Sequence, residues 1–224
     1  MILTTKLKSV YPGAMIGLVE MAGVVNRDPG STLIMHASEV EDLIKSRYAG
    51  YDRKKLLGLS ALQVYADYYK RFDKTYHVLL QLESVLLKDK AIHGPNPIVL
   101  AMFLAEMKGL LLTAVHDLEK IRGELVVDVA TGSEHYTTMS GTDQTLKAGD
   151  MFIRDDEGIL SSIIYGPDQR TMIREDSREI LFTVYAPAGI RNEDLENHLQ
   201  DLENNIRLFS PDARVVDHTV VAAI

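Results

Sequence analysis

The sequence predicts an α+β fold in which helices dominate the first half of the chain and strands the second. Before residue 110, several segments carry apolar residues at helical spacing. After it, short runs rich in Val, Ile, Tyr and Thr alternate with clusters of Gly, Asp and Ser, a pattern typical of strands and hairpins. No repeat or low-complexity linker divides the 224 residues, so we expect residues 1–224 to form a single domain.

The first elements are a buried strand and a helix. Residues 15–25 are small and apolar and end in two valines, which indicates a strand. The Asp-Pro-Gly-Ser cluster at 28–31 predicts a turn, with Ser31 as the cap of a helix that extends to about Arg47. One face of that helix carries Leu33, Ala37, Val40 and Ile44.

Further helices are expected at 60–72 and 78–88. Tyr65, Tyr68 and Tyr69 have the spacing of core residues, which we favour over an aromatic binding platform. The segment Gly-Pro-Asn-Pro at 94–97 stops the chain and begins a fourth helix, which Gly109 ends. Asn96 suits a helix cap better than a ligand contact.

The second half predicts mostly antiparallel strands between residues 124 and 185. The Asp-Asp-Glu-Gly cluster at 155–158 lies between two of them and indicates a hairpin turn rather than a calcium site. An acidic amphipathic helix follows at 192–208, packed by Leu195, Leu199, Leu202 and Ile206, and a last strand at 214–223. The other expected strands are 110–115, 124–129, 136–139, 151–154, 159–165 and 180–185.

The net charge argues against a protein whose main function is to bind a nucleic-acid backbone. The chain carries 32 acidic and 24 basic side chains, a net charge of −8, whereas phosphate contacts demand basic excess. Contact with RNA must therefore rest on a local patch, and the densest candidates are Lys6, Lys8, Arg53, Lys54 and Lys55. The alternative for Arg53–Lys55 is a solvated loop.

The composition also bounds location and cofactors. The chain has no cysteine, which fits a reducing compartment, and it shows neither a signal-peptide core nor a transmembrane stretch. We therefore expect a cytoplasmic protein without a membrane partner. The seven histidines show no metal-ligand spacing, and no nucleotide-binding glycine motif or nucleophile elbow is present. We expect neither a metal nor a cofactor.

An ordered series of short motifs runs from Asn96 to Ile190 and resembles the B3/B4 domain of the phenylalanyl-tRNA synthetase β chain. It is even more similar to stand-alone B3/B4-domain proteins. The series comprises Asn-Pro-Ile-Val at 96–99, Ala-Val-His-Asp-Leu-Glu-Lys-Ile at 114–121, Gly-Ser-Glu at 132–134, Leu-Lys-Ala-Gly-Asp-Met at 146–151, Asp-Asp-Glu-Gly at 155–158, Asp-Gln-Arg-Thr at 168–171 and Arg-Glu-Asp-Ser-Arg-Glu-Ile-Leu-Phe at 174–182.

The resemblance implies a three-layer fold of mixed, mainly antiparallel sheets with a helical layer. In the synthetase this domain holds the editing site, which hydrolyses tyrosine wrongly attached to phenylalanine tRNA. The synthetase's catalytic domain, B5 domain and anticodon-binding module have no counterpart here, so we expect a chain that cannot charge tRNA by itself. The implied partner is tRNA or an aminoacyl-tRNA end.

The resemblance also implies candidate site residues, although this chain departs from the family pattern. Ala114 stands where the family has its editing histidine, His116 falls on an aromatic position, and Gln169 stands at the glutamate of the family's Gly-Gly-Glu loop. We expect Thr113, His116 and Asp168 as catalytic candidates, and we expect them to line one concave surface together with Gln169 and Arg170.

Asp117 allows two interpretations: it either orients His116 as a charge-assisted partner or caps the turn that begins at Leu118. Arg174 and Arg178 alternate with acidic residues, which is typical of a solvated surface.

Three functions fit the sequence. The first is binding or deacylating an aminoacyl-tRNA end in trans, as an aminoacyl-tRNA deacylase. The second is non-catalytic binding of an amino-acid-like small ligand in a degenerate editing pocket. The third is docking on a partner protein. The negative charge favours the last two, and the family resemblance favours the first.

Overall fold

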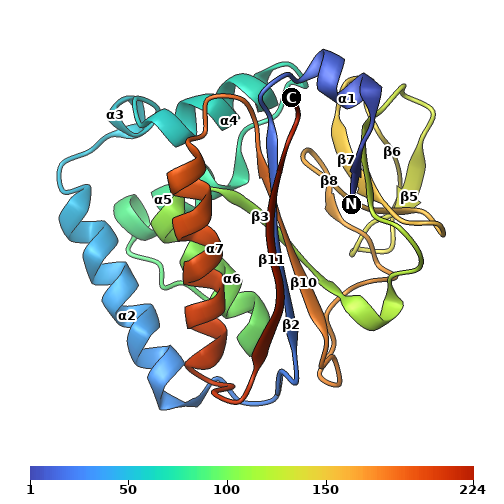
Figure 1. Cartoon of the computed structure of the whole chain (residues 1–224). Helices are drawn as coiled ribbons and strands as arrows, with labels where there is room; N and C mark the ends of the chain where they lie inside the picture. The colour runs from blue at the N-terminus through green and yellow to red at the C-terminus, as the bar shows by residue number, and fades with distance from the viewer.

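The computed structural model describes all 224 residues and arranges them in three layers (Figure 1). The helices are α1 (Thr5–Val10), α2 (Gly30–Arg47), α3 (Arg53–Leu56), α4 (Ser60–Lys70), α5 (His77–Lys88), α6 (Pro97–Gly109) and α7 (Asn192–Arg207), with a short 3-10 helix at Leu118–Lys120. The strands are β1 (Ile2–Leu3), β2 (Met15–Ala22), β3 (Leu112–Asp117), β4 (Val126–Val129), β5 (His135–Thr137), β6 (Asp143–Thr145), β7 (Met151–Arg154), β8 (Ile159–Ser162), β9 (Gly166–Pro167), β10 (Ile180–Ala186) and β11 (Arg214–Ala222).

The middle layer is a four-stranded antiparallel sheet in the order β11-β2-β10-β3. Every residue of β10 is buried, because helices cover one face of this sheet and a second sheet covers the other (Figure 1). On the helical side, Leu195, Leu199, Leu202 and Ile206 of α7 are fully buried, as the sequence predicts. This confirms the expected packing of the acidic helix.

The second sheet has the order β1-β4-β7-β8-β9, and β5 and β6 form a separate hairpin. All its strand pairs are antiparallel except β1 with β4. The β7–β8 turn is built by Asp155, whose Oδ1 accepts the N–H groups of Glu157 and Gly158. The α+β class, the mixed and mainly antiparallel sheets and this turn are therefore confirmed.

One hydrophobic core cluster draws residues from both halves of the chain. Tyr65, Tyr68 and Tyr69 of α4 belong to it, which confirms that they are core residues. The Tyr69 hydroxyl donates to the carbonyl of Ile163 (2.7 Å), and the Tyr68 hydroxyl donates to Asp150 Oδ1 (2.9 Å). These bonds connect the helical first half of the chain to the strands of the second half.

The structure differs from the sequence prediction in the short elements. The prediction that Ser31 caps α2 is wrong: the helix begins at Gly30 after Pro29, and Asp28 Oδ1 accepts the Gly30 N–H (2.9 Å). The sequence also does not indicate α1, α3, β1, β6 or β9, because elements of two to six residues are too short to show a periodic pattern. No helix combines the length and apolar character needed to cross a bilayer.

Candidate functional site

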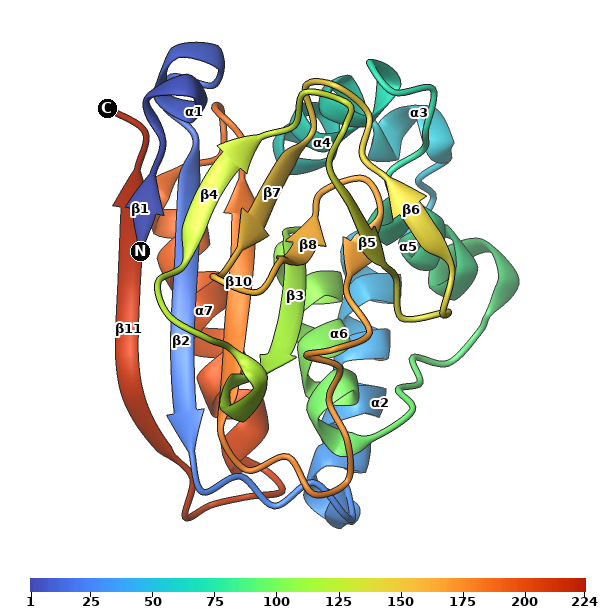
Figure 2. The ribbon, with the colours of Figure 1, turned by 90° about the vertical axis from the view of Figure 1, so that its right-hand side faces the viewer.

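The most enclosed large hollow is a cavity of about 540 Å³ between α6, the edge strand β3 and the chain that leads from β8 into β9. These elements lie in the same part of the molecule in Figure 2. Its lining is mostly apolar: Val99, Met102 and Phe103 come from α6, and Ile163 and Tyr165 from the other wall. A pocket of this size and character suits a small ligand with an apolar group.

Both ends of helix α6 are defined by local structure. Asn96 Oδ1 accepts the Val99 N–H (3.0 Å), with Pro97 at the first helical position, so the cap interpretation of Asn96 is confirmed. At the other end, a Cβ on Gly109 would lie 2.5 Å from Nδ1 of His198, so only glycine permits this approach to α7. Leu110 then leaves the helix in the left-handed conformation (φ 60°).

Strand β3 presents a free backbone edge to the cavity, because it pairs only with β10. On that edge the Thr113 N–H donates to Glu106 Oε1 (2.8 Å) and the Asp117 N–H donates to the carbonyl of Thr171 (2.8 Å). Alternate N–H groups of a strand point to the same edge. The N–H of Val115, which lines the cavity, therefore also points away from β10, to the edge of β3 that has no partner strand.

Glu106 is the one carboxylic acid in this cavity. Its side chain is only 1% exposed, its Oε2 has no hydrogen-bond partner, and burial raises its pKa to about 8. Burial also lowers the pKa of His77 to about 4, so this histidine is neutral. No lysine or arginine lines the cavity, which therefore contains no positive charge at neutral pH.

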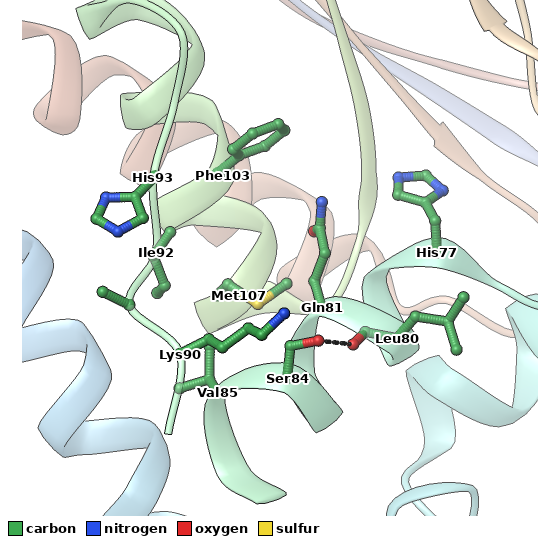
Figure 3. Close-up of a pocket in the computed structure, with 11 residues that line it drawn as sticks. His77, Leu80, Gln81, Ser84, Val85, Lys90, Ile92, His93, Phe103 and Met107 are labelled. Carbon is green, nitrogen blue, oxygen red and sulfur yellow. Dashed lines mark hydrogen bonds between the residues drawn. The ribbon is translucent and has the colours of Figure 1, made fainter. Parts of the chain in front are cut away.

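Lysine and arginine side chains line the two hollows that adjoin this cavity. Figure 3 shows the first, of about 390 Å³, which shares His77, Gln81 and Phe103 with the cavity and includes Lys90. The second hollow, of about 420 Å³, shares Pro95, Asn96 and Ile173 with the cavity and includes Arg27 and Arg174 together with one acid, Glu175. The cavity, which has no lysine or arginine, thus adjoins two hollows that each contain at least one.

Of the predicted catalytic candidates, only Thr113 lines the cavity, and its hydroxyl is bonded to Nε2 of His198 (2.7 Å). His116 is fully buried, and its Nδ1 is bonded to the Thr171 hydroxyl (2.7 Å). Burial lowers the pKa of His116 to about 3. The same Thr171 hydroxyl donates to Asp168 Oδ1. The structure therefore links His116 to Asp168 through Thr171. These three side chains lie outside the cavity.

The expectation that Thr113, His116 and the 168–170 loop line one concave surface is wrong. Thr113 and His116 are three residues apart on β3, and successive side chains of a strand point to opposite faces. Asp168, Gln169 and Arg170 line a different hollow, of about 470 Å³. There the Arg170 guanidinium pairs with Asp155 (2.8 Å).

Asp117 has the structural role of a cap. Its Oδ1 accepts the Glu119 N–H (3.1 Å), and its Oδ2 accepts the Ser177 hydroxyl (2.7 Å). The cap interpretation is confirmed, and Asp117 does not pair with His116. Arg174 and Arg178 are exposed, as their sequence pattern predicts.

The basic triplet lies on α3 and lines none of the four hollows. Arg53 is paired with both carboxylate oxygens of Glu83 (2.8 and 2.6 Å), and Lys55 Nζ donates to the carbonyl of Gly50 (3.1 Å). Lys54 is the one residue of the triplet that is exposed and makes neither an ion pair nor such a hydrogen bond.

Glu106 was not among the residues predicted from the sequence. The signal that marks it is a lone acid within the apolar run of the 97–109 helix.

The comparisons with known proteins agree with this architecture. Over 82 residues the chain is 32% identical to the phenylalanine–tRNA ligase beta subunit of Fusobacterium nucleatum, which covers 36% of this chain and 10% of that subunit. The crystal structure of an N-terminal fragment of the phenylalanyl-tRNA synthetase β-subunit from Pyrococcus horikoshii shares the fold, with a TM-score of 0.50 and 12% identity over 98% of this chain and 53% of that one. The chain thus spans about a tenth of the curated relative and about half of the solved fragment. Residues 65–204 match the model of the B3/4 domain. This chain belongs to the B3/4 domain family.

Proposed function

We propose that this B3/4 domain binds the aminoacyl end of a charged tRNA in trans, with the amino acid in the cavity beside α6. The observation that carries the proposal is the distribution of charge. The cavity offers apolar walls and one acid, whereas Lys90 lies in one adjoining hollow and Arg27 and Arg174 lie with Glu175 in the other. The amino acid of a charged tRNA suits the apolar cavity, and the phosphates of the attached RNA suit the neighbouring basic side chains.

Deacylation is the reaction that such binding makes possible. Hydrolysis of an ester requires an oriented water molecule and a donor for the oxygen on which charge develops. In this proposal the donor is the Val115 N–H on the free edge of β3. His116 and Asp168 are engaged with Thr171 outside the cavity, so they do not serve as the base in this proposal.

A screen of aminoacyl-tRNAs tests the proposal. The protein is incubated with correctly and incorrectly charged tRNAs, and both binding and loss of the ester are followed. We expect weak binding that depends on salt, because at most two or three phosphates meet a basic side chain. Each such contact contributes a slope of about 0.7 log units of affinity per log unit of salt for single strands.

Two lysine variants sharpen this test. Lys90→Ala removes an exposed cation beside the cavity and should lower the salt slope by about 0.7. Lys54→Ala removes an exposed cation on α3, away from the hollows, and should leave the slope unchanged. Equal effects of the two variants would contradict the proposed orientation of the RNA.

A second candidate is a module that binds a free amino-acid-like ligand without RNA. The net charge of −8 and the neutralisation of Arg53 by Glu83 favour it. Absence of any aminoacyl-tRNA binding at low salt would rule out the first function and leave this one.

A further inference from the structure

We propose that Glu106 binds the ammonium group of the ligand, and that the cavity thereby selects an amino acid in ester linkage over the free amino acid. The inference rests on the proposed function, because it names the chemical class that the same cavity accepts. Glu106 would be a specificity-determining residue rather than a catalytic one.

One carboxyl oxygen of Glu106 is bonded to the protein and the other has no hydrogen-bond partner. Oε1 accepts the Thr113 N–H, which fixes the carboxyl group against the edge of β3. Oε2 has no partner although the side chain is buried and lines the cavity. A buried polar atom without a partner is costly. A ligand that donates a hydrogen bond to Oε2 removes this cost.

Three neighbouring tyrosines and His77 do not fill that role. The hydroxyl groups of these tyrosines donate to main-chain carbonyls: Tyr65 to that of Tyr185, Tyr69 to that of Ile163 and Tyr76 to that of Leu110. Burial keeps the pKa of each tyrosine above its ordinary value, so all three are neutral. His77 is neutral too. The carboxyl group therefore faces no cation of the protein.

This charge pattern distinguishes two forms of the same amino acid. A free amino acid brings an ammonium and a carboxylate, and the carboxylate would enter an apolar cavity with no lysine or arginine and with an acid beside it. An ester or amide brings the ammonium alone, and its carbonyl oxygen can accept from the Val115 N–H. Buried charges without a partner are strongly disfavoured. The ester form should consequently bind better.

The same pattern favours release after hydrolysis. Water adds across the ester bond, the bond between the carbonyl carbon and the ribose oxygen breaks, and the ribose oxygen takes up a proton. The new carboxyl group ionises at neutral pH, and its charge has no counter-ion in the cavity. The product is thus rejected by the site that bound the substrate.

Calorimetric titration with small probes tests the inference without tRNA. The probes are the amides of leucine, methionine, phenylalanine and tyrosine, each compared with the free amino acid and the N-acetyl amide. For at least one side chain we expect the amide to bind at least tenfold more tightly than the free amino acid, and the N-acetyl amide to bind no better than the free amino acid. Because Glu106 holds a proton in the empty cavity at pH 7 and loses it to pair with an ammonium, binding should release a proton. Titration in buffers of different ionisation enthalpy measures that proton.

The variants Glu106→Gln and Glu124→Gln complete the test. The first should lose both the amide preference and the proton release, whereas the second makes the same change at an exposed site and should keep both. Equal affinity for amide and free amino acid, an unaltered preference in Glu106→Gln, or no binding of any amide at millimolar concentration would overturn the inference. The proposed function fails separately, if amides bind but no aminoacyl-tRNA does.

Discussion

The buried carboxyl group of Glu106 makes the stability of the fold depend on pH, and the Glu106→Gln variant isolates this dependence. Burial raises the pKa of Glu106 to about 8 from an ordinary value of 4.5. Below 4.5 the group is protonated in both the folded and the unfolded chain, and its contribution to stability is fully present. As the pH rises to 8, the unfolded chain ionises while the folded chain does not, so this contribution is lost.

The magnitude follows from the two pKa values. Their separation corresponds to roughly 5 kcal/mol of stability lost above pH 8 and to roughly 3 kcal/mol lost at pH 7. Glutamine has nearly the same shape as the protonated acid and retains an oxygen for the Thr113 N–H. Glu106→Gln should therefore match the wild type near pH 4.5 and exceed its stability by several kcal/mol at pH 8.

Urea unfolding at pH 5, 6, 7 and 8 measures the free energy of unfolding of Glu106→Gln minus that of the wild type. All other titrating groups are common to both proteins, so their contributions cancel in this difference. It should grow by roughly 1.4 kcal/mol per pH unit between pH 5 and 7. Glu124→Gln serves as the control, because the same substitution at an exposed position should give a small difference that does not change with pH. A difference for Glu106→Gln that stays constant over this range would refute the assignment of a protonated acid to the cavity.

Two further substitutions test the packing around the site. Asp155→Asn breaks the pairing of a fully buried carboxylate with Arg170 and should lower the free energy of unfolding by about 3 kcal/mol in urea titration; a loss below that of a surface substitution would contradict this. Gly17→Ala places a Cβ 2.9 Å from Leu195 Cδ1 and 3.0 Å from Leu199 Cδ2, so we expect a loss of about 1–3 kcal/mol, seen as a lower thermal midpoint. An unchanged midpoint would mean that α7 shifts freely on the sheet.

Local signals in the sequence determined the main elements of this protein. Asn96 and Pro97 mark the start of α6 because a side-chain cap and a proline act within one turn of helix. The stripe from Leu195 to Ile206 marks the buried face of α7, since helical periodicity appears within sixteen residues. The motif series from Asn96 onward indicated the family, because it depends on order along the chain.

Only the tertiary structure decided which side chains meet. Thr113 and His116 are close in sequence, yet β3 separates them onto opposite faces, so the expected common pocket does not exist. Arg53 belongs to a basic triplet in the sequence, yet the fold pairs it with Glu83 and neutralises it. Glu106 is an ordinary glutamate in the sequence, and its free oxygen and raised pKa arise only where α6 packs against the edge of β3. Burial and charge environment depend on residues distant along the chain, and for that reason the site followed from the fold rather than from the motifs.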